Sequence, residues 1–277
     1  MDEVERKLEK IVKNTGSKSS FLLTFTGKGS RIQKTFEPQI SINPGCHYEI
    51  AFTSLETYFS IPNIDKGNNS LTIAKTGGGG VVVGSGGKPV NIKIESGCYG
   101  LLDLNTEITR LLKELGGGDD AGIKNAVSFE PNYSTFKCIM VLKAGYEVDF
   151  KTDKDSIRSV LGFDKKIYKA EKGGAGPGGK RIESEHVVDI MKVNSIFIHC
   201  DLVSGSYVNG LPSPILYSFF PLADPGDKII EKPTEYIYLP IESDVIRHMT
   251  VWLTDQELNP INLREETLTI GLHLRSC

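Results

Sequence analysis

The chain has 277 residues, of which 39% are hydrophobic, and its formal net charge is −3 at pH 7. This length is sufficient for one large domain or two small ones. The nearly balanced charge gives no general argument for nucleic-acid binding. No apolar run approaches the about 20 residues that a membrane-spanning helix needs. We therefore expect neither a membrane nor a nucleic acid among the partners of this protein.

The cysteines are scattered and never form a CxxC pair. The N-terminal residues do not resemble the apolar core of a signal peptide, because charges interrupt them at nearly every turn. An odd number of unpaired cysteines without an export signal is most simply a set of reduced thiols in an intracellular protein. The five cysteines are Cys46, Cys98, Cys138, Cys200 and Cys277.

The N-terminal segment Asp2–Lys13 has the spacing of an amphipathic helix, with charged residues at most of its other positions. A helix of about three turns is marginal alone in water, so it must dock on its own domain or tie subunits together. The polar stretch Asn14–Ser20 reads as a hinge. We therefore divide the chain into an arm and hinge, residues 1–20, and a main domain, residues 21–277. The candidate subunit-interface residues on the arm are Val4, Leu8, Ile11 and Val12.

Three segments rich in β-branched and aromatic residues follow the hinge and are predicted to be strands: Phe21–Gly27, Thr35–Asn43 and His47–Ser60. Apolar residues alternate at the start of the third segment, which is typical of a half-buried strand. One face of that strand is predicted to carry Tyr48, Ile50 and Phe52, and the opposite face His47, Glu49, Ala51 and Thr53.

The next region predicts a hairpin and a helix. Leu71–Ala74 and Val90–Gly97 are expected to pair around a glycine-rich loop, Thr76–Gly87. The segment Asp103–Leu115 predicts a helix that packs on a sheet, with Asp103 as its N-terminal cap and glycines at its end. Its apolar stripe consists of Leu104, Ile108, Leu111, Leu112 and Leu115.

A second hairpin is predicted from Ala126–Asn132 and Thr135–Gly145, which are joined by a short turn. Tyr146–Phe150 is expected to continue the second arm of this hairpin after a glycine bend. Ser156–Phe163 predicts a short helix that ends at a glycine. Lys165–Glu185 is polar, charged and rich in glycine, so we expect a long exposed loop there.

The last third of the chain is a series of short apolar segments separated by Gly, Pro, Asn and Asp. This succession predicts an all-β sandwich or barrel. The predicted strands lie in Val193–Val203, Ser213–Leu222, Thr234–Ile241, His248–Asp255 and Glu266–Arg275.

One glycine-rich segment, Gly174–Lys180, has the spacing of a phosphate-binding loop up to its last position. Arg181 then stands where such a loop has the Ser or Thr that binds Mg²⁺, and Pro177 removes a backbone donor. No buried strand precedes the segment and no apolar helix follows it. We interpret it as a surface loop and predict no nucleotide or other cofactor.

The histidines do not predict a metal site. In Cys46-His47 and His199-Cys200 the two side chains would point to opposite faces of a strand, so neither pair can chelate one ion easily. His199 and His273 each lie among apolar residues, which is typical of a hydrogen-bonded structural histidine. The chain has no Gly-x-Ser-x-Gly motif, and Trp252 is expected in the core or at an interface. We predict no catalytic, metal-binding or cofactor-binding residue, no small-molecule substrate and no enzymatic activity.

The order of several phrases in the chain carries a resemblance to a known family. The phrases are TSLETYFSIPNI, ESGCYGLLDLN, SIRSVLGF, VNSIFIHCDLVSGSYVNG, PILYSFFP, PGDKIIEKPTEYIYLPI, VIRHMTVWLTDQELNPINL and LTIGLHLR. Over Tyr48–Arg275 the sequence resembles the jelly-roll capsid proteins encoded by Polinton (Maverick) elements and adintoviruses. Its length fits the single jelly-roll minor capsid (penton) protein of that lineage. The resemblance implies an antiparallel jelly-roll β-sandwich with an N-terminal helical arm and one or two inserted helices.

The same resemblance implies a structural role. The expected protein is a capsid subunit that binds copies of itself, most simply as a homopentameric ring, and also binds other capsid proteins. Its expected location is the virion, after intracellular assembly. The alternative is a β-sandwich module that binds a protein or a glycan through the loops at its ends.

Overall fold

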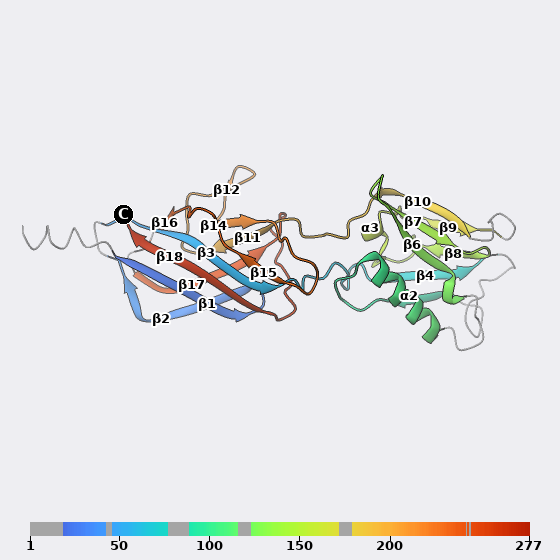
Figure 1. The fold of residues 1–277 in the computed structure, drawn as a ribbon, viewed down its shortest axis with the longest axis horizontal. Coiled ribbons are helices and arrows are strands. Elements are labelled where there is room, and N and C mark those ends of the chain that lie inside the picture. The colour runs from blue at the N-terminus through green and yellow to red at the C-terminus, as the bar shows by residue number, and fades with distance from the viewer. Residues whose placement is uncertain are drawn as a thin grey trace, which may run out of the picture. The chain divides into compact units, whose positions relative to one another are not determined.

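A computed structural model describes residues 19–42, 46–76, 89–115, 123–171, 179–241, 243 and 245–277. The predicted arm helix Asp2–Lys13 and most of the glycine-rich segments at 76–87 and 174–180 lie outside the described residues. The chain forms two compact units (Figure 1). Unit 1 comprises Met1–Ile61 and Val193–Cys277, and unit 2 comprises Pro62–Lys192. Pro62–Lys192, which lies in sequence between the two segments of unit 1, thus folds as a compact unit of its own.

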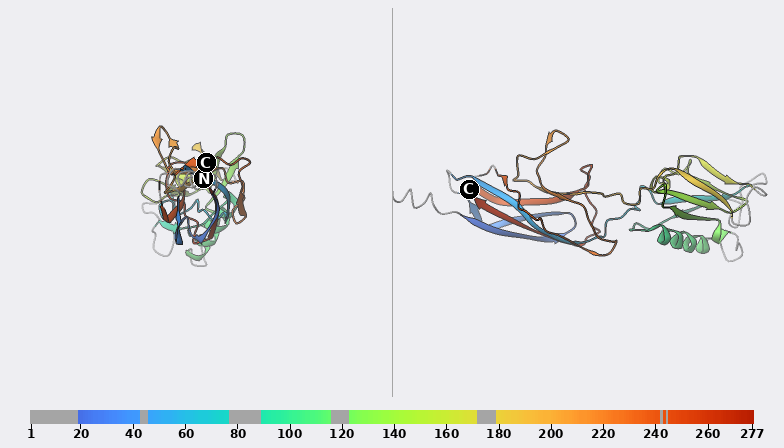
Figure 2. Two further views of the ribbon diagram at one scale, coloured as in Figure 1. Left: turned by 90° about the vertical axis from the view of Figure 1, so that its left-hand side faces the viewer. Right: turned by 45° about the horizontal axis from the view of Figure 1, so that its top comes forward.

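Unit 1 contains two antiparallel sheets, which Figure 2 shows from two further directions. Sheet A has the order β1 (Ser20–Lys28), β18 (Thr267–Ser276), β3 (Tyr48–Tyr58) and β15 (Lys228–Glu231), with the short strand β16 (Leu239–Pro240) also paired to β3. Sheet B has the order β14 (Ile215–Phe219), β11 (Ile196–Cys200), β17 (Val245–Thr254) and β2 (Arg31–Ser41).

The eight main strands follow jelly-roll topology. When these eight are numbered along the chain, sheet A reads 1-8-3-6 and sheet B reads 5-4-7-2. Successive strands therefore alternate between the two sheets, except that strands 4 and 5 are neighbours in sheet B, as in two interlocked Greek keys. The predicted all-β, antiparallel jelly-roll sandwich is confirmed. A small hairpin, β12 (Tyr207–Val208) and β13 (Leu211–Pro212), precedes β14.

The last strand, β18, lies between β1 and β3, and every second residue from Leu268 to Leu274 is buried. Four of its side chains point into the sandwich and have no exposed surface: Leu268, Ile270, Leu272 and Leu274. Each fully buried side chain of this size contributes about 1.5–3 kcal/mol through removal from water. Because this strand pairs with the first strand of the chain over nine residue pairs, the two ends of the described sequence meet in one sheet.

The positions of strand β3 that are buried shift by one residue part-way along the strand. Tyr48, Ile50 and Phe52 are buried as predicted, but beyond them the buried positions are Leu55 and Thr57. The pairing with β18 shifts by one residue between these two groups, which is a β-bulge. Ala51, which is predicted on the face opposite Ile50 and Phe52, is also fully buried.

Unit 2 contains a four-stranded and a three-stranded antiparallel sheet. The first has the order β5 (Val90–Lys93), β4 (Ser70–Lys75), β8 (Tyr146–Asp149) and β9 (Ile167–Ala170). The second has the order β10 (Lys180–Val187), β7 (Lys137–Leu142) and β6 (Val127–Asn132). Both predicted hairpins, β4 with β5 and β6 with β7, are confirmed.

Two predictions about the strands of unit 2 are wrong. Tyr146–Phe150 does not continue β7 but crosses to the other sheet, where β8 pairs with β4 and β9. Lys165–Glu185 is not a single long loop, because it contains β9 and most of β10. Charged residues conceal the alternation in β9, where Tyr168 and Ala170 are buried and the residues before each are exposed.

The predicted helix is present as α2, Leu101–Leu115, and its buried face consists of Leu104, Ile108 and Leu112. The helix begins before Asp103, so the prediction that this residue is the N-cap is wrong. Its carboxylate instead accepts a hydrogen bond from the Gly100 N–H. The amide of Asn105 bonds both the N–H and the C=O of Phe129 in β6, at 2.8 and 2.7 Å. These bonds satisfy backbone groups of an edge strand that would otherwise stay unpaired.

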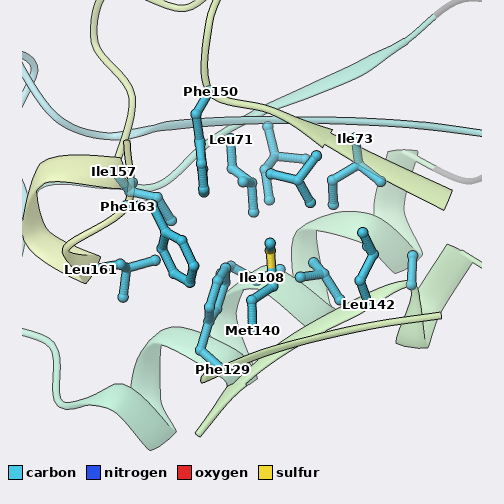
Figure 3. Close-up of a cluster of buried hydrophobic side chains, with 14 of the residues drawn as sticks. Leu71, Ile73, Ile108, Phe129, Met140, Leu142, Phe150, Ile157, Leu161 and Phe163 are labelled. Carbon is cyan, nitrogen blue, oxygen red and sulfur yellow. The ribbon is translucent and has the colours of Figure 1, made fainter. Parts of the chain in front are cut away.

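The core of unit 2 lies between its two sheets (Figure 3). Leu71 and Ile73 of β4 face Phe129, Met140 and Leu142 of β6 and β7 across this core. The predicted short helix is present as α3 (Arg158–Leu161), preceded by the buried Ile157 and followed by Gly162 at φ 77°. Four aromatic rings pack together beside α3, with centroid separations between 5.2 and 6.3 Å: Phe129, Phe150, Phe163 and Tyr168.

The side chain of Asn63 joins the two ends of unit 2. The amide of Asn63, near the start of the unit, donates hydrogen bonds to the C=O of Tyr99 at 2.8 Å and of Ile190 at 3.2 Å. Its Oδ1 accepts from the Tyr99 N–H at 2.9 Å. Since Ile190 lies just before the chain returns to unit 1, the entry and exit segments of unit 2 are held next to each other.

The C-terminal strands are largely as predicted, except that a different segment forms the edge strand of sheet A. Thr234–Ile241 contributes only the two-residue strand β16, and its first four residues are exposed. The strand on this edge of sheet A is β15, which the prediction missed because four residues with two charges show too little alternation.

Gly162 provides a test of the packing around α3. A Cβ there would lie 2.3 Å from the carbonyl oxygen of His186, and the backbone has positive φ. Gly210 has a similar φ of 82° but nothing within 4 Å of a Cβ. We expect Gly210→Ala to cost only the about 1–2 kcal/mol of left-handed backbone, and Gly162→Ala to cost clearly more. Urea unfolding of both variants measures this, and equal losses would contradict the packing described.

Candidate functional site

The exposed apolar side chains of unit 1 are concentrated on one part of the chain. Eleven large hydrophobic residues are exposed in the part of unit 1 that the structure describes, and seven of them fall between positions 207 and 237. We call these seven the apolar edge: Tyr207, Leu211, Phe220, Leu222, Ile230, Tyr236 and Ile237. Exposed apolar residues scattered singly need no explanation, whereas a concentration of them indicates a binding surface.

The topology places these seven residues on one side of the sandwich. β14 and β15 are the terminal strands of the two sheets and are joined directly by the loop Phe220–Asp227. The hairpin of β12 and β13 leads into β14, and β16 pairs with the same edge of β3 as β15 does. Two side chains of the joining loop are strongly exposed, Phe220 at 69% and Leu222 at 97%.

A polar cluster anchors the exposed segment that carries Tyr236 and Ile237. The Tyr238 hydroxyl lies 2.6 Å from Nδ1 of His273 on β18, and the Arg275 guanidinium lies over the Tyr238 ring at 3.4 Å. Arg275 is in turn bonded to Glu49 of β3. Tyr238 is thereby fixed against the outer face of sheet A, and the residues just before it are held out to solvent.

The same histidine contacts a serine. Nε2 of His273 lies 2.6 Å from the Ser20 hydroxyl, so a hydroxyl, an imidazole and a phenol form a hydrogen-bonded chain. Hydrolases place a carboxylate where Tyr238 stands, and its charge stabilises the imidazolium that forms during the reaction. A phenol is neutral near pH 7 and supplies no such charge. We assign this chain of hydrogen bonds to positioning β1 and Tyr238 on β18.

A small cavity adjoins this cluster at the end of sheet A. Its volume is about 280 Å³. The lining residues are Ser19, Ser20, Glu49, Arg275, Ser276 and Cys277. The Arg275 guanidinium and the Glu49 carboxylate in its wall neutralise each other, so the cavity presents no net charge from this pair to a ligand.

The opposite side of the sandwich is formed by β1 and β2, which are joined by a tight turn. Three cations lie in or beside this turn and all are exposed: Lys28, Arg31 and Lys34. We call these three residues the basic edge. No acidic residue occurs between positions 28 and 34.

His199, a predicted structural histidine, is buried on the outer face of sheet B. Its ring stacks on Trp252 at 4.9 Å, and the Arg31 guanidinium lies 5.4 Å from the centre of the Trp252 ring system. Nε2 lies 2.8 Å from the Thr254 hydroxyl, and Nδ1 has no hydrogen-bond partner among the described residues. Burial lowers the pKa of His199 to about 4, so this ring is neutral at pH 7.

The cysteines differ in environment. Burial raises the pKa of the Cys138 and Cys200 thiols to about 12, which leaves them protonated and unreactive. Among the described residues, no three His, Cys, Asp or Glu side chains lie close enough to hold a metal ion. In the same part of the chain, no helix is long and apolar enough to span a membrane.

The predicted interface residues on the arm, Val4, Leu8, Ile11 and Val12, lie outside the described residues. The predicted site thus remains a hypothesis from helical spacing alone. The apolar edge was not recognised from the sequence, because its segments were interpreted as strands with buried residues. Pro221, Pro225 and Pro233 were a usable signal, since proline cannot donate to a sheet and tends to keep flanking residues in loops.

Unit 2 has a polar network that sequence reasoning also missed. The Glu185 carboxylate accepts hydrogen bonds from Lys166, from the Tyr168 hydroxyl at 2.6 Å and from the Asp164 N–H at 3.1 Å. Burial alone would raise the pKa of Glu185, but these donors outweigh it and lower the pKa to about 2. His186 lies beside Asp164 at 3.0 Å. The network ties β10 to β9 and to the end of α3, which is a structural role.

Comparison with known proteins identifies a fold neighbour. No family model and no curated protein matches the sequence. Among solved structures, the crystal structure of the selenomethionine-labelled mavirus penton protein is similar to this chain, with 12% identity and a TM-score of 0.49. The match covers 94% of this chain and 100% of that one. At this identity and TM-score the match carries no functional argument, and the fold assignment rests on the strand order.

The environment of His199 predicts a pH dependence. The folded-state pKa of about 4 lies below the ordinary value of 6.5, so the unfolded chain binds the proton first as the pH falls. The stability that neutral His199 contributes is present above pH 6.5 and is lost on the way to pH 4, by on the order of 3 kcal/mol at pH 4.

Urea unfolding between pH 7 and pH 4 measures this loss of stability. We expect His199→Gln to abolish the contribution of His199 to the loss. The exposed His248→Gln serves as the matched control and should leave the slope unchanged. An NMR titration of the native protein gives the pKa of His199 directly, and a value near 6.5 would refute the prediction.

Proposed function

We propose that this protein is a structural capsid subunit, a single jelly-roll protein of the penton or minor capsid type that assembles into a ring in the virion. The observation that carries the proposal is the apolar edge on the β14 and β15 side of the sandwich. A subunit that acted alone would expose Phe220 and Leu222 to water without compensation.

The distribution of this surface also favours a ring over a two-fold dimer. The apolar edge lies on one side of the sandwich, and the opposite side is the basic edge. Two unlike surfaces on opposite sides of one subunit make head-to-tail contacts, which close into a ring when the rotation between subunits allows it. Five copies is the number that the sequence resemblance implies.

The proposed function needs no catalytic group, no cofactor and no small-molecule substrate. Its partners are copies of the same chain and the neighbouring capsid proteins, and the β12–β13 hairpin supplies two further exposed apolar side chains, Tyr207 and Leu211, for such contacts.

Light scattering of the purified protein at low and high concentration tests this function. We expect a discrete oligomer, with a mass near five times 30.4 kDa for a pentamer. The variant Phe220→Ser with Leu222→Ser should keep its fold and shift the equilibrium toward the monomer. Leu102→Ser, which changes a side chain 77% exposed in unit 2, is the matched control and should assemble normally. Unchanged assembly of the double variant would exclude the apolar edge as the contact.

Deletion of the predicted arm provides a second test of assembly. If Val4, Leu8, Ile11 and Val12 contact a neighbouring subunit, deletion of Met1–Lys13 should leave the domain folded and weaken the oligomer. Circular dichroism and sizing of the truncated protein measure both properties. Unfolding of the truncated monomer would show instead that the arm docks on its own domain.

A second candidate function is recognition of a protein or a glycan, and the turn between β6 and β7 favours it. Tyr133 is 83% exposed and Phe136 is 72% exposed, the latter with a positive φ of 55°. Hydrogen bonds from Asn132 and Thr135 to Glu183 hold the turn rigid. A monomer at every concentration, together with a binding partner lost in Tyr133→Ala with Phe136→Ala, would establish this function in place of the first.

A further inference from the structure

The two sides of the sandwich carry opposite charge. The four carboxylates between Phe220 and Ile241 exceed the two lysines there, so that segment has a net charge of −2. One of the lysines, Lys228, is already paired with Glu56 at 2.6 Å. The acidic side chains that remain directed to solvent include Asp224 and Asp227, which are in the same loop as Phe220 and Leu222.

The β1–β2 side is positive. The basic edge contributes three cations, and the neighbouring loop adds Arg264, Glu265 and Glu266, whose backbone contacts the turn through the bond from the Gly29 N–H to the Glu266 C=O at 3.0 Å. With Glu37 of β2 included, four cations and three carboxylates leave this side with a net charge of +1. Glu265 and Glu266 are on the same loop as Arg264, and Glu37 lies three residues beyond Lys34 on β2, so the segment 28–34 itself contains no acidic residue.

The register of sheet A places the two sides at the same level. Thr26, Thr269, Glu56 and Ile230 form one row across all four strands. Lys28 lies two residues beyond Thr26, and Lys228 lies two residues beyond Ile230 in the same direction. Asp227 is the next residue along. The basic edge and the acidic loop therefore mark the two ends of one level of the sheet.

From these three observations we propose that the basic edge of one copy binds the loop Phe220–Asp227 of the next copy, with Lys28 and Lys34 opposite Asp224 and Asp227. The proposal rests on the proposed function and names the two surfaces of its subunit contact. Because both lie at one level, a neighbour needs no shift along the strands to bring them together. The same loop presents Phe220 and Leu222, which exclude water from the contact and strengthen its charge interactions.

A second copy is the occupant that the geometry requires. Three strand spacings separate the two sides of sheet A, roughly 14 Å, so they cannot meet within one subunit. The contact joins unlike surfaces, and each copy retains one free surface of each kind. Addition of copies therefore continues until a ring closes.

Charge reversal tests this pairing in the full chain. The variant Lys28→Glu with Lys34→Glu should raise the dissociation constant of the oligomer about tenfold or more, because it places like charges opposite each other. The control Lys143→Glu with Lys151→Glu changes the net charge equally at two exposed lysines of unit 2. It should assemble as the unmodified protein does. Sedimentation velocity at low and moderate salt provides the constants.

The decisive variant combines both reversals. Adding Asp224→Lys and Asp227→Lys to the basic-edge variant restores opposite charges and should restore the oligomer, while the aspartate pair changed alone should weaken it. Failure of the four-residue variant to recover, with both pairs folded by circular dichroism, would overturn the pairing but leave the proposed function intact. An unmodified protein that is monomeric at every concentration would overturn both.

Discussion

The jelly roll of unit 1 depends on the pairing of its last strand with its first. β18 lies between β1 and β3, and its four fully buried leucine and isoleucine side chains form the centre of the sandwich core. Without β18, sheet A would separate into a single strand and the β3–β15 pair. The contact that completes the sheet thus joins the most distant parts of the sequence, and contacts of this kind form late and slowly in folding.

The surface features follow from that arrangement. Since β18 and β3 occupy the centre of sheet A, its two edges are β1 and β15, and the corresponding edges of sheet B are β2 and β14. One side is then closed by a short turn and the other by long loops rich in proline. His273, on the central strand, links both sides: it contacts Ser20 of β1 and Tyr238 of the segment before β16. A single histidine therefore couples the position of one edge to the position of the exposed segment at the other.

Much of the fold could be predicted from the sequence because alternation and turn residues are strong in the long strands. β1, β3, β17 and β18 were recognised by these signals. The failures have local causes. β9 and β10 contain charged residues on their exposed faces and border a glycine-rich segment, so they resembled a loop. The bulge in β3 opposite Gly271 shifts the buried positions of that strand by one residue, from even to odd numbers. Gly271 has little space for a side chain, because a Cβ there would lie 2.6 Å from the hydroxyl oxygens of Thr53 and Ser54. The apolar edge could not be predicted in the same way. Its residues are exposed because their segments lie outside the sheets, and the pairing between strands distant in sequence determines which segments those are.

The hydrogen bonds of Asn63, which hold the entry and exit of unit 2 together, affect the entropic cost of folding the sandwich. β3 and β11 are separated by the whole of unit 2, which is about 130 residues from Pro62 to Lys192. If unit 2 remained unfolded, joining these strands would require closing a loop of that length. Once unit 2 has formed and Asn63 has brought its entry and exit together, the loop is much shorter. By the logarithmic dependence of loop entropy on length, this shortening is worth about 2 kcal/mol. Folding of unit 2 before the sandwich would thus lower the entropic cost of bringing β3 and β11 into their sheets.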